Sequence, residues 1–132
     1  MIALDTSVLA RFILNDTPAE QQLAEQLIAE NKCSVSWSVL IELSWVLEYS
    51  VRLPRKEVVS GLVTVADTDG ISVPDAGLLA WALDRYASGA DFADMIHLVS
   101  ATNDATEFAC FDRKLARQAG PETPLAVRTL RS

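Results

Sequence analysis

Short apolar runs alternate with helix-like stretches along this chain. Residues 2–4 and 108–111 are apolar runs too short for a helix, and each is typical of a buried strand. Elsewhere apolar residues recur at helical spacing, and Gly, Pro, Asn and Asp mark the turns. The predicted strands cover residues 2–4, 33–36, 71–73, 108–111 and 125–127, the last at a sheet edge. The predicted helices cover about residues 6–14, 18–32, 55–66, 74–89, 92–99 and a short segment before Gly120. A further helix, with Ser38 as its cap, runs through residues 39–47 and stops before Pro54.

Strands separated by helices require crossover connections, and these favour a mainly parallel sheet that is covered on both faces. We therefore expect an α/β fold with three layers, α/β/α, and a mainly parallel sheet of four to five strands. Neither a repeat nor a low-complexity linker interrupts the alternation. The sequence predicts a single domain over residues 1–132.

The amino-acid composition limits the kinds of binding site that this chain can form. Two cysteines without a CxxC pair and one histidine exclude a structural zinc site. A net charge of −7 argues against a nucleic-acid binder held by electrostatics alone. The local basic group Arg113, Lys114 and Arg117 could be a solvated helix face or could contact phosphates. The sequence has no basic leader and no apolar run long enough for a membrane span, so we expect a cytoplasmic protein.

Four acidic residues stand where a carboxylate is either useful or costly. Asp5 and Asp112 each directly follow a predicted strand, and ligands gather beyond the carboxyl ends of parallel strands. Glu42 and Asp94 lie within or beside apolar helical stretches, where a charge is unfavourable unless something compensates it. The pattern suggests a metal centre. Its candidate residues are Asp5, Glu42, Asp94 and Asp112.

Each acid also has a purely structural interpretation. The two acids that follow strands could cap the helices after them. Glu42 could belong to a narrow polar stripe that faces solvent with Ser38 and Tyr49. Asp94 could pair with Asp91 in a variant of the capping box. The residues alone leave both interpretations open.

Other residues with reactive or aromatic side chains favour structural roles. His97 lies one turn after Asp94, where a helix-borne histidine is more often structural than a general base. Trp45 and Trp81 lie on apolar helices, which indicates the core or a subunit interface, with base stacking as the alternative. Cys110 stands between apolar neighbours and is predicted to be an inert, packed thiol.

Taken together, four segments resemble the PIN-domain ribonucleases, in particular the VapC toxins of bacterial VapBC toxin–antitoxin pairs. The segments agree with that family in order and spacing, and the resemblance covers essentially the whole chain. They are residues 2–9 (IALDTSVL), the helix that contains Glu42, residues 90–98 (ADFADMIHL) and residues 111–115 (FDRKL).

The resemblance implies a metal-dependent ribonuclease. Asp5, Asp94 and Asp112 would bind Mg²⁺ or Mn²⁺ directly or through water, and Glu42 would bind a second ion or orient the attacking water. This is physically sensible, because close carboxylates repel one another and a hard divalent cation relieves that repulsion. The resemblance also implies an RNA substrate, a homodimer and a VapB-type antitoxin, whose arginine would suit the acidic pocket.

Two positions depart from the family pattern. Ser7 stands where family members often have asparagine, and Cys110 stands where they have threonine. A thiol is a poor substitute for a hydroxyl that orients a ligand or a bound water. Outside this family, Ser7 also stands where a haloacid-dehalogenase phosphatase needs a second aspartate. A non-catalytic interaction module, in which the acids are caps and surface charges, remains the alternative.

Overall fold

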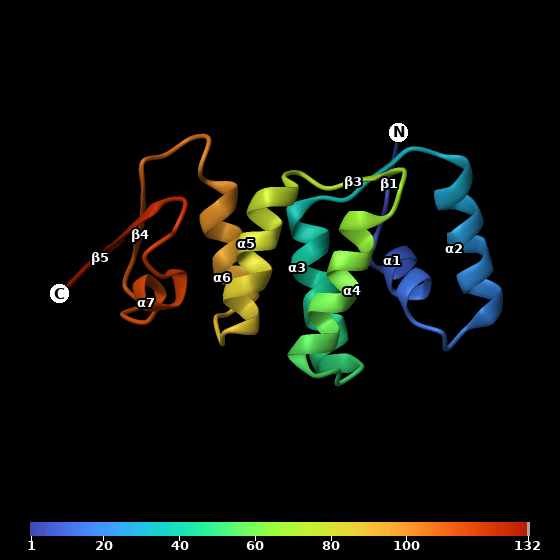
Figure 1. Cartoon of the computed structure of the whole chain (residues 1–132), viewed down its shortest axis with the longest axis horizontal. Helices are drawn as coiled ribbons and strands as arrows, with labels where there is room; N and C mark the ends of the chain where they lie inside the picture. The colour runs from blue at the N-terminus through green and yellow to red at the C-terminus, as the bar shows by residue number, and fades with distance from the viewer. Residues whose placement is uncertain (132) are drawn as a thin grey trace. The chain divides into compact units, whose positions relative to one another are not determined.

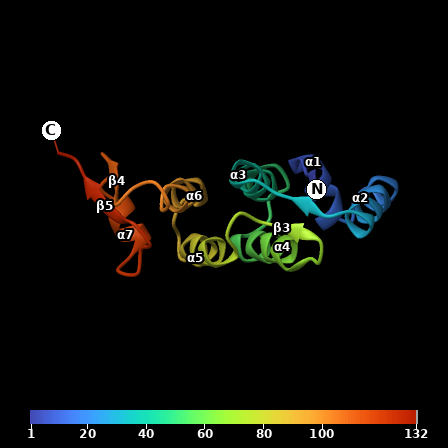
Figure 2. The same ribbon diagram turned by 90° about the horizontal axis from the view of Figure 1, so that it is seen from above.

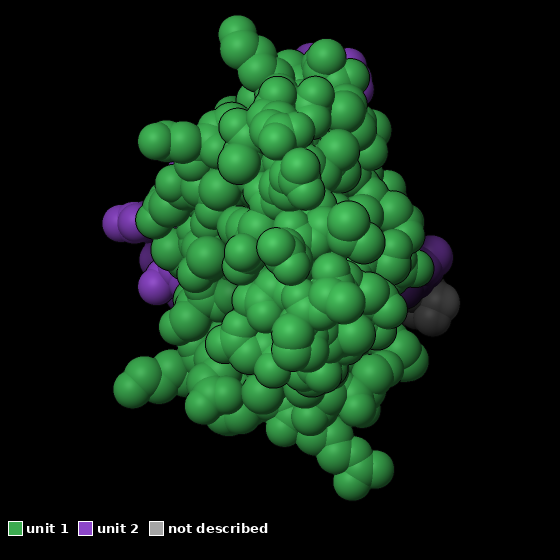
Figure 3. Space-filling model, turned by 90° about the vertical axis from the view of Figure 1, so that its right-hand side faces the viewer, with its two compact units in different colours: residues 1–76 green, residues 77–132 purple. Residues whose placement is uncertain are grey.

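The computed structural model describes residues 1–131. Its contacts divide the chain into two compact units, Met1–Ala76 and Gly77–Ser132, coloured green and purple in Figure 3. Ser132, the last residue of the predicted domain, lies outside the described residues. The single domain over residues 1–132 therefore stays a prediction.

Unit 1 contains a three-stranded parallel sheet in the order β1–β2–β3, of which β1 and β3 are labelled in Figure 1. Its elements are β1 (Ile2–Ala3), α1 (Thr6–Ile13), α2 (Pro18–Glu30), β2 (Cys33–Ser34), α3 (Trp37–Trp45), the π-helix η1 (Val46–Ser50), α4 (Arg55–Asp67) and β3 (Ile71–Ser72). Cys33 in β2 is in register with Ile2 on one side and with Ile71 on the other. Helix α1 packs against α2 and α3, and α3 packs against α4 (Figure 2).

Side-chain caps fix where α1 and α3 begin. The Asp5 carboxylate accepts a hydrogen bond from the Ser7 N–H at 3.3 Å, so Asp5 caps α1. Ser36 Oγ accepts one from the Val39 N–H at 3.2 Å, so Ser36 caps α3. The predicted cap, Ser38, is wrong because the extended backbone ends at Ser36 and Ser38 is already helical.

Helix α3 passes directly into η1, and the helical stretch stops before Pro54 as predicted. The Val51 N–H donates to the Val46 carbonyl at 2.9 Å, five residues back. The Leu53 N–H then reaches the Leu47 carbonyl at 2.9 Å. The turn that follows Glu42 is therefore one residue wider than an α-helical turn.

Unit 2 contains a two-stranded parallel sheet and three α-helices (Figure 1). Its elements are α5 (Ala76–Ala87), α6 (Phe92–Ser100), β4 (Glu107–Cys110), α7 (Leu115–Ala119) and β5 (Ala126–Thr129). Residues Glu107 to Cys110 pair in register with Ala126 to Thr129. Gly120, with a φ of 81°, ends α7 at the position predicted from the sequence.

The apolar runs at β1 and β4 are not the buried strands that the sequence predicts. Both residues of β1 are exposed, and exposed and half-buried residues alternate along β4. Phe111, directly after β4, is 72% exposed. Each of these strands has one pairing neighbour in its own sheet, so an edge remains uncovered within the unit. The buried side chains come mainly from helices, including Leu9, Leu40, Leu43, Leu62, Leu79, Tyr86, Met95 and Leu98.

The α/β class with parallel strands is confirmed. Residues 1–131 form seven α-helices and five strands, and every described strand pair is parallel. The helix and strand order follows the predicted order throughout. No helix in residues 1–131 has the length and apolar character needed to cross a membrane.

Candidate metal centre

In unit 1, Asp5 and Glu42 line one cleft of about 380 Å³. Asp5 leaves the carboxyl end of β1, and Glu42 projects from α3. Val46 and Val51, at the two ends of the widened helical turn, also line this cleft. The structure therefore brings together two of the four predicted acids, although they lie far apart in the sequence.

Asp5 is held by its own helix. Ser7 Oγ donates to Asp5 Oδ2 at 2.7 Å, and the Ser7 N–H donates to the same oxygen at 3.3 Å. These bonds, led by the Ser7 hydroxyl, lower the pKa of Asp5. The predicted capping role is confirmed. Both bonds from Ser7 end on Oδ2, so Ser7 fixes the orientation of the carboxylate, and the Thr6 N–H lowers the Asp5 pKa further.

Glu42 and Ser38 on α3 are exposed, as is Tyr49 on η1, which agrees with the stripe interpretation. Trp45, also on α3, is 57% exposed, with its ring centroid 5.8 Å from that of Tyr49. Trp45 is therefore not a core residue of the unit. Exposure of Glu42 agrees with either interpretation of this acid, because a metal ligand must also be reachable.

Thr6 is the residue in this cleft that sequence reasoning missed. It lines the cleft beside Asp5, is only 5% exposed, and its Oγ1 has no hydrogen-bond partner among residues 1–131. A buried hydroxyl without a partner is unfavourable unless a water or an ion satisfies it. The only sequence signal is the Asp-Thr pair, which by itself predicts no more than another helix cap.

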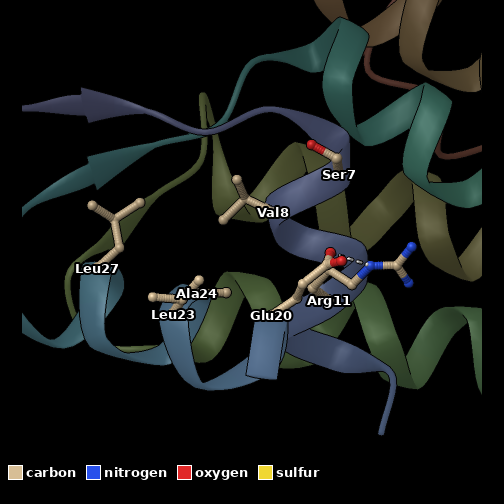
Figure 4. Close-up of a pocket in the computed structure, with 7 residues that line it drawn as sticks. All are labelled: Ser7, Val8, Arg11, Glu20, Leu23, Ala24 and Leu27. Carbon is tan, nitrogen blue, oxygen red and sulfur yellow. Dashed lines mark hydrogen bonds and ion pairs between the residues drawn. The ribbon is translucent and has the colours of Figure 1, made fainter. Parts of the chain in front are cut away.

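Arg11 lies where the acidic cleft meets a more apolar groove of about 240 Å³ between α1 and α2. It pairs with Asp16 at 3.4 Å and with Glu20 at 3.0 Å. Figure 4 shows Val8 facing Leu23, Ala24 and Leu27 across this groove. Ser7 and Arg11 line both hollows, so the groove adjoins the acidic cleft.

In unit 2, Asp94 is half-buried on α6. Burial raises its pKa, and the negative charges of Asp91 and Asp112 raise it further, while His97 acts in the opposite direction. Asp91 caps the helix, since its Oδ2 accepts a bond from the Asp94 N–H at 2.9 Å. The predicted cap is thus confirmed for Asp91, and Asp94 carries an electrostatic cost.

Asp112 stands in the turn between β4 and α7. Its Oδ1 accepts a hydrogen bond from the Lys114 N–H at 2.8 Å. Cys110 Sγ donates to the Asp112 carbonyl at 3.5 Å, and this thiol is half-buried rather than fully packed as predicted. The cysteine at the family's threonine position therefore contacts the backbone of a predicted metal ligand.

Comparison with known protein families matches residues 2–121 to the PIN domain. The chain belongs to the PIN domain family. PIN domains are typically metal-dependent nucleases. The match to the PIN domain runs across the boundary between the two units and includes all four predicted acids. A search of curated proteins found no match.

The donor set of this PIN domain fits a hard divalent cation. All four acids offer carboxylate oxygens, which suit Mg²⁺ and Mn²⁺. Like-charge crowding at Asp94 and the unpartnered Thr6 hydroxyl are both features that a hydrated cation would relieve. The acids occur as two pairs, Asp5 with Glu42 and Asp94 with Asp112. Residues 1–131 contain no cluster of three or more His, Cys, Asp or Glu side chains placed to hold a metal, so the four-acid centre stays a prediction.

Proposed function

We propose that this PIN domain is a cytoplasmic Mg²⁺- or Mn²⁺-dependent ribonuclease, a toxin of the VapC type. The observation that carries the proposal is the cleft that Asp5 shares with Glu42 in a chain of this nuclease family. The interaction between Asp94 and Asp112 supports it from unit 2. The proposed catalytic and metal-binding residues are Asp5, Glu42, Asp94 and Asp112.

Each acid has a distinct task in the proposed reaction. A bound cation lowers the pKa of a coordinated water and offsets the negative charge that develops on a scissile phosphate. Asp5 would present its carboxylate in the orientation that Ser7 fixes. Asp94 and Asp112 would supply further negative charge, and Glu42 would orient the water or hold a second ion.

The same proposal includes two protein partners. A VapB-type antitoxin would insert an arginine into the acidic cleft, since a guanidinium pairs well with carboxylates. The apolar groove that adjoins this cleft would take the neighbouring apolar part of the antitoxin. A homodimer would account for large apolar side chains that are exposed on the single chain, such as Trp45.

The second candidate is a non-catalytic interaction module. The hydrogen bonds that the Asp5 and Asp112 carboxylates accept favour it, because each carboxylate already has a structural partner, although Asp112 does not cap α7. The half-buried Asp94 argues against it, since a charge under this burden has no evident structural use.

Cleavage of a labelled pool of RNA oligonucleotides by the purified chain tests the proposal. We expect cleavage with Mg²⁺ or Mn²⁺ and none with EDTA. Asp112→Asn is the informative variant, because an amide oxygen can still accept the Lys114 N–H while the negative charge is lost. Asp104→Asn, an exposed acid of the same unit, is the control. Cleavage that persists in EDTA, or that Asp112→Asn leaves unchanged, would refute the metal-dependent mechanism.

A further inference from the structure

Unit 2 has a hollow lined by basic side chains, whereas the cleft in unit 1 is lined by acidic ones. The hollow in unit 2 has a volume of about 260 Å³ and is lined by Arg113, Thr129 and Arg131. Arg113 directly follows Asp112 in the turn after β4, and the other two residues lie at and beyond the end of β5. We propose that these three side chains form a phosphate-binding subsite for the backbone of an RNA strand.

Strand register explains why residues so far apart in sequence meet here. Cys110 and Thr129, the last residues of β4 and β5, are aligned in the parallel pair. The Leu130 N–H also donates to the Cys110 carbonyl at 2.7 Å, which extends the pairing past the end of β5. Both strands therefore release their next residues at the same sheet edge, where ligands of parallel sheets gather.

The lining is suited to an anion. Guanidinium groups donate several hydrogen bonds in a fixed plane and match phosphate oxygens, and the Thr129 hydroxyl adds another donor. Neither Arg113 nor Arg131 forms an ion pair with a carboxylate of residues 1–131. By contrast, Arg128 in β5 does form an ion pair, with Glu107 at 2.6 Å.

The place of the subsite favours RNA over a free anion. Arg113, which lines this hollow, directly follows Asp112, a predicted metal ligand, in the chain. A strand whose scissile phosphate reached the acids would bring a neighbouring phosphate to the arginines. In a chain of net charge −7, such a local cationic site would offset general repulsion of the RNA. This choice of ligand rests on the proposed function.

The subsite also refines the basic group that the sequence indicates. Of Arg113, Lys114 and Arg117, only Arg113 lines the hollow. Lys114 and Arg117 are exposed elsewhere on the turn and α7. The pair Lys114→Gln with Arg117→Gln removes the same charge as Arg113→Gln with Arg131→Gln, and it is therefore a matched control.

The test measures affinity for a single-stranded RNA oligonucleotide between 50 and 300 mM salt, with Ca²⁺ in the Asp94→Asn background so that cleavage does not interfere. We expect Arg113→Gln with Arg131→Gln to weaken binding about tenfold and to reduce the salt slope by about 0.7 for each phosphate that is no longer neutralised. The matched control should lower affinity less than threefold. Thr129→Val, which keeps the side-chain shape, should weaken binding about two- to threefold.

A titration with inorganic phosphate, followed by amide NMR shifts, separates this proposal from the proposed function. Shifts confined to residues 113, 129 and 131 support the subsite even if the chain cleaves no RNA. Equal affinity and equal salt slope for the two double variants, in a chain that does cleave RNA, would overturn the subsite and leave the nuclease standing. A melting curve for each variant checks that its fold is intact.

Discussion

The two units supply one pair of predicted site acids each, but they hold their carboxylates differently. In unit 1, Asp5 is exposed and receives two hydrogen bonds from Ser7, and its pKa is lowered. In unit 2, Asp94 is half-buried near two other acids, and its pKa is raised. The protein itself stabilises the charge on Asp5, whereas at Asp94 burial and the neighbouring acids outweigh the opposing effect of His97. A cation is therefore worth more to unit 2 than to unit 1.

The largest expected effect is the loss of RNA cleavage when a predicted site acid of either unit is replaced. Asp5→Asn and Asp94→Asn should each reduce divalent-dependent RNA cleavage by at least about 100-fold, because even an outer partner of a metal ligand is worth about 10- to 100-fold. Initial cleavage rates at saturating Mg²⁺ or Mn²⁺ measure this effect. A parental rate for either variant would remove that residue from the metal site. Asp104→Asn should keep the parental rate.

Thr6→Val tests whether the buried hydroxyl serves a ligand. If a metal-bound water satisfies Thr6 Oγ1, the variant should lose about tenfold in activity or metal affinity. In the metal-free protein it should be more stable by about 1 kcal/mol, because valine removes an unpartnered buried hydroxyl without changing the shape. Metal titration and a melt in EDTA give the two values. Unchanged activity with raised stability would make Thr6 a packing residue only.

The contrast between the units also predicts opposite responses to pH. The folded protein raises the pKa of Asp94, so this residue lowers stability as pH rises from its unfolded pKa to its raised folded pKa, and the loss is constant above that range. Asp94→Asn should therefore raise the Tm of the metal-free protein at pH 7 by about 1 to 3 °C. The gain should disappear below about pH 3, where both states are protonated.

Asp5 provides the other half of this comparison. Its lowered pKa means that it contributes stability above its unfolded pKa and loses that contribution as pH falls through the folded value. Asn caps helices about as well as Asp but carries no charge, so Asp5→Asn should leave the Tm at pH 7 unchanged or slightly lower. A gain at Asp5 equal to the gain at Asp94 would contradict the difference between the units.

The smallest expected effect concerns Cys110. Because its thiol is half-buried and already donates to the Asp112 carbonyl, a threonine hydroxyl should find the same acceptor. Cys110→Thr should therefore bind Mg²⁺ or Mn²⁺ at least as well as the parent, with the Tm unchanged within about 1 °C. Parallel melts and metal titrations decide this. A lower Tm with unchanged affinity would separate residue 110 from the site.

The order and type of the elements could be predicted because apolar spacing and turn residues act locally. The exposure of β1 and Phe111 could not be predicted, because an apolar run does not reveal how many neighbouring strands its strand will have. Arg113 and Arg131 line the same hollow because of the register of β4 against β5, and no local pattern encodes that register. The candidate acids are recognisable from strand ends and from charges in apolar helices. Thr6 is not, because an unpartnered hydroxyl appears only in three dimensions.

The π-helix η1 is a place where the chain could lose one residue without losing the helix. A π turn contains one residue more than an α turn, so deleting one residue from η1 could restore regular α-helix without breaking the elements on either side. The deletion would rotate Val51 by about 100° about the helix axis relative to Val46 and Glu42. One wall of the acidic cleft would turn away from the other. A homologue that lacks this single residue would therefore keep the fold of unit 1 but have a differently shaped cleft.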